Sequence, residues 1–137
     1  MKYQCIILVV ACALGGCVNS QLLDAAKMAE VGPPPGRDEI LGDAQTCIGE
    51  HLKDPDSAEY YMVGQPYRAM LGTAFNGGIA WNGWAVDLDV NAKNAFGGYT
   101  GKSRYTLLTM PDHHCWDHLL AEDYGTPADE DPLFHKL

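Results

Sequence analysis

The chain has no apolar run long enough to cross a membrane as a helix. Its main apolar run is CIILVVACAL, the ten uncharged residues from Cys5 to Leu14. A helix needs about 20 such residues to span the hydrocarbon core of a bilayer. Ten residues behind Met1 and Lys2 are instead typical of the apolar region of a secretory signal peptide, which we predict over residues 1–16.

Basic residues are also scarce. The chain carries nine Lys and Arg against eighteen Asp and Glu, so its formal net charge is −9. An acidic surface repels nucleic-acid phosphates, and no basic cluster offsets this repulsion, so we expect no nucleic-acid partner. Five of the acidic residues lie between Glu122 and Asp131 with no basic residue among them. We therefore expect residues 122–137 to form a disordered acidic tail.

The sequence lacks the common catalytic signatures. It has no G-x-S-x-G elbow, no Walker-type loop and no Rossmann glycine pattern. Asp87 and Asp89 are two residues apart, so in a strand they share one face, where a carboxylate pair could act on glycans. Such alternation is more typical of the solvent face of a sheet. We expect no catalytic residues and no cofactor, and the sequence favours a non-enzymatic protein.

The apolar run ends in Leu14-Gly15-Gly16-Cys17, four residues that resemble the lipobox of bacterial lipoproteins. The resemblance implies that diacylglycerol is attached to Cys17, that residues 1–16 are removed, and that a second acyl group such as palmitate is added. One acyl chain anchors a protein only marginally, whereas two or more anchor it stably. Lys2, the apolar run and the box agree, which favours a lipoprotein over an ordinary cleaved signal with an incidental Cys17.

The residues after the lipobox indicate a cellular location and a spacer. Val18 in place of aspartate resembles lipoproteins sorted to the outer membrane, so we expect a lipid-anchored protein on its periplasmic face. We expect residues 17–37 to form a tether, because GPPPGR stops any helix and favours an extended polyproline segment.

The cysteine count becomes simple after this processing. Cys5 and Cys12 leave with the signal peptide, and Cys17 carries lipid. Cys47 and Cys115 then remain in an oxidising compartment, so one disulfide between them is the economical prediction. In the chain-entropy model a bridge that closes a loop of roughly 70 residues stabilises the fold by about 3–4 kcal/mol.

A histidine cluster surrounds the second of these cysteines in the segment DHHCWDH. His114 and His118 are four residues apart, a spacing that places two imidazoles on one helix face and that zinc accepts. No second ligand pair with a recognisable spacing occurs elsewhere, and a metal would compete for Cys115. We favour the disulfide and no bound metal; the alternative is a metal-binding protein or small enzyme that uses His113, His114 and His118.

Hydrophobic periodicity predicts one α+β domain over residues 38–121. A helix that begins near Asp38 and ends before Pro55 carries an apolar stripe formed by Ile40, Leu41, Ala44, Cys47, Ile48 and Leu52. Strands are predicted over residues 57–63, 81–93 and 99–110, with an irregular connection over residues 64–80. A short C-terminal helix is expected to begin at Asp112 and to include Leu119 and Leu120. We expect the first helix to pack, as an N-terminal helix, on a small antiparallel sheet.

Two segments of this domain resemble a group of small, largely uncharacterised bacterial envelope lipoproteins. The segments are LKDPDSAEYY, residues 52–61, and GWAVDLDVNAKNAFGGYTG, residues 83–101. Many members of the group have a cysteine before the second segment, whereas this chain has Leu88 and Asp89 there. The resemblance implies a small α+β domain and transfers no activity.

The loop within the second segment has two open interpretations. One is a ligand or partner site formed by Asn91, Lys93, Asn94, Phe96 and Tyr99. The other is a demanding turn in which Asn side chains satisfy the backbone and the aromatic residues pack the loop down. We expect a non-enzymatic accessory or binding protein of the cell envelope with a protein partner. A metal-binding protein or enzyme, and an inhibitor of a foreign hydrolase, are the alternatives.

Overall fold

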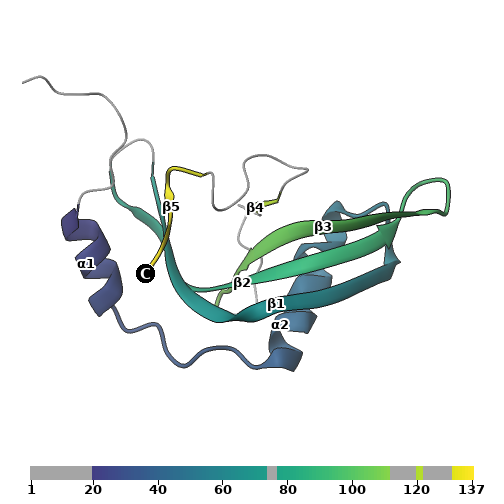
Figure 1. The fold of residues 1–137 in the computed structure, drawn as a ribbon. Coiled ribbons are helices and arrows are strands. Elements are labelled where there is room, and N and C mark those ends of the chain that lie inside the picture. Colours follow the sequence, from purple (N-terminus) through teal and green to yellow (C-terminus); the bar gives the residue numbers. More distant parts are fainter. Residues whose placement is uncertain (1–19, 74–76, 112–119, 122–130) are drawn as a thin grey trace, which may run out of the picture.

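Helices and a five-stranded antiparallel sheet make up the described part of the chain (Figure 1). The structure, a computed structural model, describes residues 20–73, 77–111, 120–121 and 131–137. Its elements are α1 (Ser20–Met28), α2 (Arg37–Cys47), the 3₁₀ helix η1 (Gly49–His51), β1 (Asp54–Gly72), β2 (Ile79–Lys93), β3 (Tyr99–Leu108), β4 (Leu120–Ala121) and β5 (Phe134–Lys136). The predicted α+β class with an antiparallel sheet is confirmed.

The strands lie in the order β4-β3-β2-β1-β5. β2 and β3 form a hairpin, as the alternation over residues 81–93 and 99–110 predicts. β2 pairs with β1 from Lys93 to Ile79, whereas its pairing with β3 ends at Ala85, opposite Leu108. The first residues of β2 therefore have a strand neighbour on one side only among the described residues.

β1 continues through a stretch that the sequence predicts to be irregular, so that prediction is wrong for residues 64–72. The pairing with β2 shifts between Val63 and Tyr67, where Gly64, with a φ of 81°, and Pro66 form a bulge. A bulge tolerates glycine and proline because its extra residues leave the hydrogen-bonded ladder. The strand resumes beyond it with its two faces unchanged.

One hydrophobic core lies between α2 and the sheet. The stripe predicted for this helix is buried against alternate residues of β2 and β3, and the cluster comprises Ile40, Ala44, Cys47, Ile48, Val86, Leu88, Val90, Tyr105 and Leu107. Burial of each large aliphatic side chain stabilises the fold by about 1.5–3 kcal/mol. The predicted packing of this helix on the sheet is confirmed, although α2 is the second helix and not the N-terminal one.

A second core lies on the opposite face of the sheet, because neighbouring residues of a strand point to opposite sides. It comprises Ala69, Leu71, Trp81, Ala85, Leu108 and Phe134. Phe134 comes from β5, the strand next to β1, so the C-terminal segment contributes to this core as part of the sheet.

The segment expected to be a tether contains α1, which packs on the sheet. Ala26 is fully buried, and its carbonyl accepts hydrogen bonds from Arg68 Nη2 at 2.8 Å and from Asn82 Nδ2 at 3.1 Å. Further along, the Gly32 carbonyl accepts a hydrogen bond from the Trp84 indole N–H at 3.2 Å. Residues 20–32 are therefore attached to the sheet and do not act as a free spacer.

The C-terminal predictions need correction where the structure describes them. Residues 134–136, expected to be disordered, form β5 and pair with residues 69–71 of β1, and Phe134 is buried. Leu120 and Ala121, expected in or just after a short helix, form β4 beside β3. The rest of the predicted helix, residues 112–119, and residues 122–130 of the acidic tail lie outside the described residues, as do residues 1–19 with Cys17.

Candidate partner-binding surface

The turn between β2 and β3 projects from one end of the sheet (Figure 1). Asn94 organises it: its backbone N–H donates to the Gly98 carbonyl at 2.9 Å, and its carbonyl accepts from the Gly97 N–H at 3.0 Å. The Asn94 side-chain Oδ1 accepts two further bonds, from Phe96 N at 2.9 Å and from Gly98 N at 3.1 Å. Gly97 has a φ of 81°, a conformation that glycine adopts without strain. The turn is therefore held in one conformation by its own polar groups.

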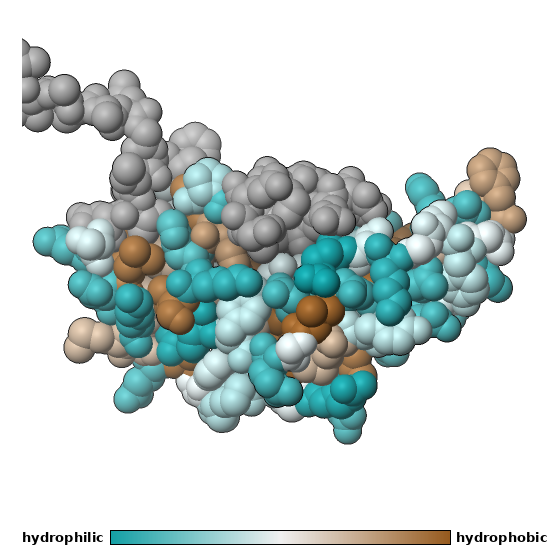
Figure 2. All heavy atoms as spheres, in the orientation of Figure 1, coloured by the Kyte–Doolittle hydropathy of each residue, from teal (hydrophilic) through white to brown (hydrophobic). Residues whose placement is uncertain are grey.

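Phe96 is the most exposed large apolar side chain in the described part of the chain. Its exposed fraction is 97%, and Figure 2 shows apolar atoms at the end of this hairpin. The interpretation of the loop as a structural turn is correct for Asn94, but its expectation that Phe96 packs the loop down is wrong. The turn presents an uncovered aromatic ring to its surroundings.

Residues 52–61 and residues 83–101, the two segments that resemble the envelope lipoproteins, meet at the base of this hairpin. Ser57 Oγ accepts a hydrogen bond from the Lys93 backbone N–H at 2.9 Å, and the Tyr99 hydroxyl donates to the Ser57 carbonyl at 3.3 Å. The Lys93 ammonium lies 5.6 Å from the centre of the Tyr99 ring, within range of a cation–π contact. Lys93 and Tyr99, both predicted site residues, thus support the hairpin, and Tyr99 remains 51% exposed.

Asn91 is set apart from the other predicted site residues. It stands on the sheet opposite Glu59 and Lys102, and its buried Oδ1 has no hydrogen-bond partner among the described residues. The structure therefore brings Lys93, Asn94, Phe96 and Tyr99 together at the hairpin end and leaves Asn91 on the strand behind them.

Tyr61 also belongs to this exposed surface, although it is not among the predicted site residues. Its ring is 41% exposed, the Lys102 ammonium lies 4.0 Å from the ring centre, and its hydroxyl donates to Glu59 Oε2 at 3.0 Å. That hydrogen bond, followed by the negative charge of Glu59, raises the pKa of Tyr61. The alternation of SAEYYMV predicts that Tyr60 and Tyr61 face opposite sides, but not which of them faces solvent.

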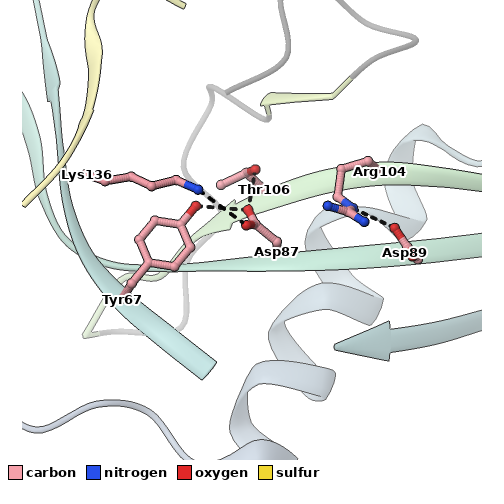
Figure 3. A network of polar contacts seen from close by, with 6 residues as sticks. All are labelled: Tyr67, Asp87, Asp89, Arg104, Thr106 and Lys136. Carbon is pink, nitrogen blue, oxygen red and sulfur yellow. Dashed lines mark hydrogen bonds and ion pairs between the residues drawn. The ribbon is translucent and has the colours of Figure 1, made fainter. Parts of the chain in front are cut away.

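Asp87 and Asp89 lie on the sheet face opposite α2, each with partners on neighbouring strands (Figure 3). Asp87 Oδ1 accepts hydrogen bonds from the Tyr67 hydroxyl at 2.9 Å and the Thr106 hydroxyl at 2.8 Å. Its Oδ2 lies 3.8 Å from the Lys136 ammonium. Asp89 forms an ion pair with Arg104, with 2.6 Å between Oδ1 and Nε.

These contacts give the two carboxylates structural roles. Asp87 connects β1, β2, β3 and β5, and its side chain is only 17% exposed. Asp89 links β2 and β3 near the surface. Both carboxylates are engaged with hydroxyl groups or cations of this chain, which accords with a structural sheet face rather than a catalytic pair. Asp87 is nevertheless more buried than a simple solvent face implies.

The predicted cysteine and histidine sites are only partly described. Cys47 is 6% exposed and disulfide-bonded, and every other cysteine lies outside the described residues, so its pairing with Cys115 stays a prediction. His113, His114 and His118 also lie outside them. Within the described residues no group of three or more His, Cys, Asp and Glu side chains is placed to hold a metal ion.

The described helices are too short or too polar to span a bilayer. Comparison with family models, with curated proteins and with solved structures gives no match to this chain. The surface at the β2–β3 turn is therefore defined by its own geometry: a conformationally fixed turn, a supported hairpin base and an uncovered phenylalanine.

Proposed function

We propose that this chain is a lipid-anchored, non-enzymatic binding protein of the bacterial cell envelope, which contacts a protein partner through the tip of the β2–β3 hairpin. The observation that carries the proposal is the 97% exposure of Phe96 on a turn whose backbone is fixed by Asn94. An uncovered phenylalanine gains about 1.5–3 kcal/mol when a partner buries it. A turn that is already ordered loses little conformational entropy on binding.

The groups around Phe96 suit a protein interface. Tyr99 and Tyr61 add partly exposed aromatic rings, and Lys93 and Lys102 lie beside those rings. Aromatic residues are enriched at the energetically important centres of interfaces, whereas cations at the rim guide orientation. A partner with a shallow apolar pocket and a flanking acidic group would complement this surface.

The membrane anchor is proposed from Leu14-Gly15-Gly16-Cys17, and Val18 supports an outer-membrane, periplasm-facing location. Only Val18 and Asn19 separate Cys17 from the start of α1 at Ser20. An extended chain covers about 3.3–3.6 Å per residue, so the anchor would hold α1 close to the leaflet. α1 and the β2–β3 turn lie at opposite ends of the sheet (Figure 1), so the hairpin tip would point away from the anchored end.

The test is site-specific photocrosslinking in intact envelopes. A photoreactive residue at position 96 should capture a reproducible protein partner, whereas the same residue at the exposed Glu50 should not capture it. Phe96→Ser should abolish capture from a neighbouring position such as Ala95. Cys17→Ala should abolish palmitate labelling. If position 96 and position 50 give the same products, the hairpin tip is not the binding surface.

A second candidate, an inhibitor of a foreign hydrolase, is favoured by the same fixed turn with one exposed apolar residue. A loop of this kind can enter an active-site cleft, and the acidic surface would suit a basic enzyme. In that case the crosslinked partner is a hydrolase, and Phe96→Ser abolishes inhibition of it.

A further inference from the structure

A groove lies beside the first residues of β2, at the end of the strand remote from the β2–β3 turn. Its volume is about 710 Å³. One wall is β2 from Ala80 to Trp84, the second is the proline-rich linker of residues 30–35, and the third is the segment 109–111 that follows β3. This volume lies within the range of small-ligand and peptide sites, about 300–1,000 Å³.

The strand edge that faces this groove is open. Pairing between β2 and β3 ends at Ala85, and the last backbone contact is from the Thr109 N–H to the Trp84 carbonyl at 3.0 Å. Backbone groups alternate sides along a regular strand, so Asn82 directs its N–H and C=O groups to the same side as Trp84, whereas the register with β1 shifts at Ala80. No strand among the described residues pairs with them on that side.

Two tryptophans give the groove fixed apolar walls. The Trp81 indole N–H donates to the Thr109 carbonyl at 3.2 Å, and the Trp84 indole N–H donates to the Gly32 carbonyl at 3.2 Å. Gly83 lies under the Trp81 ring, where an added Cβ would approach a ring carbon to 2.9 Å. Because both indoles are hydrogen-bonded, the walls are preformed and do not have to be ordered by a ligand.

The charged side chains that line the groove are acidic, while one cation, Arg68, contacts two lining residues: its guanidinium lies 3.2 Å from Asn82 Oδ1 and 5.9 Å from the Trp84 ring centre. Glu30 and Glu39 are the charged residues that line it, and Glu30 is exposed. The whole chain carries a formal net charge of −9. An occupant that complements the groove therefore combines apolar side chains, for the tryptophan walls, with at least one cationic side chain.

We propose that this groove binds an extended, basic and apolar segment of a partner protein, which adds as a short strand to the open edge of β2. Backbone hydrogen bonds to Asn82 supply the strand pairing, and side chains on the two faces of the segment reach the Trp81 and Trp84 indoles, the mode known as β-strand addition. Lysine or arginine on the segment lies near Glu30. The site is separate from the hairpin tip and does not depend on Phe96.

The test uses the full chain with Cys17→Ala and a fluorescein-labelled peptide in which lysine and valine alternate. Fluorescence anisotropy should show saturable binding. Glu30→Lys should weaken binding about threefold to tenfold at low salt.

Two controls distinguish groove binding from general attraction to an acidic protein. Glu50→Lys makes the same charge change on η1, away from the groove, and should leave affinity nearly unchanged. Phe96→Ser should also leave it unchanged, which separates this proposal from the function proposed for the hairpin. Absence of peptide binding, or equal loss in Glu50→Lys and Glu30→Lys, would each overturn the proposal.

Modified peptides test the strand pairing with the unmodified groove. N-methylation of one alternate set of peptide amides should abolish binding, whereas methylation of the other set should not, because only one set faces β2. Equal affinity of the two methylated peptides would rule out strand addition.

Discussion

The hydroxyl of Ser57 accepts a hydrogen bond from the backbone N–H of Lys93 at 2.9 Å and donates one to the Asp54 carbonyl at 2.8 Å. Asp54 and Lys93 are themselves partners in the β1–β2 register. A single serine thus joins the start of β1 to the end of β2, directly below the turn that carries Phe96. This junction supports the base of the hairpin.

Ser57→Ala should destabilise the protein by about 1–2 kcal/mol, because a half-buried hydroxyl with two hydrogen bonds is lost and the Lys93 N–H is left without its acceptor. Thr46→Ala is the matched control, since its hydroxyl bonds only to the Gly42 carbonyl on an exposed helix face. Urea unfolding measures both. Equal changes for the two variants would contradict the role of Ser57.

Gly97→Ala should destabilise the turn by about 1 kcal/mol, because alanine disfavours the φ of 81° at this position. Gly98→Ala is the control, since Gly98 does not have a positive φ of this kind and an added Cβ would lie 3.9 Å from Asn94 Oδ1, an ordinary contact distance. Partner crosslinking from position 96 should fall in Gly97→Ala and persist in Gly98→Ala. Unchanged capture in both variants would show that the turn conformation is not needed.

Asp87→Ala should cost about 2–4 kcal/mol, because the buried Thr106 hydroxyl and the Tyr67 hydroxyl both lose their acceptor. Asp89→Ala should cost about 0–1 kcal/mol, since its partner Arg104 is largely solvated, with a side chain that is 44% exposed. Thermal or urea unfolding compares the two. A larger loss for Asp89 than for Asp87 would refute the assignment of Asp87 as the connecting residue.

Stability should fall in alkaline solution as the pH rises through the raised pKa of Tyr61. The hydrogen bond to Glu59 and its charge raise this pKa above the ordinary 10.0, so the folded protein holds a proton that the unfolded chain has released. The contribution is complete below about pH 10 and is lost above the raised pKa. Glu59→Gln should lower the Tyr61 midpoint in an ultraviolet titration referenced to Tyr61→Phe, whereas Glu50→Gln should not.

The disulfide of Cys47 should leave no free thiol in the processed domain when thiols are counted under denaturing, non-reducing conditions. Cys115→Ser should expose one thiol, that of Cys47, which is the last residue of α2 and packs in the core. Loss of the bridge should lower stability by about 2–5 kcal/mol. Two free thiols in the unmodified domain would contradict a bridge between Cys47 and Cys115.

Local patterns predicted the elements that carry a clear period. The stripe through Ile40, Ala44 and Ile48 predicted α2, and the alternation from Trp84 to Val90 predicted β2, because each pattern reflects one buried face. The sequence also marked the hairpin loop as a site or a demanding turn. The structure combines these interpretations, since Asn94 orders the turn while Phe96 stays exposed.

Elements that depend on distant contacts were missed. β5 has three residues and one large apolar side chain, Phe134, so only its pairing with residues 69–71 defines it as a strand. β1 was predicted only over residues 57–63, because Gly64 and Pro66 are read as a loop when their neighbours on β2 are unknown. The contact between Ser57 and Lys93 joins residues 36 positions apart, which no local pattern reveals.

The bulge at Gly64 and Pro66 has a consequence for how copies of the protein meet one another. Among the described residues β1 is an edge strand over much of its length, since β5 pairs only with its residues 69–71. A long straight edge strand can pair with the same strand of a second copy. β1 is bent and has no N–H at Pro55 and Pro66, so it cannot pair along its full length with β1 of another copy. The bulge that made part of β1 look irregular in the sequence therefore disfavours aggregation through this strand edge.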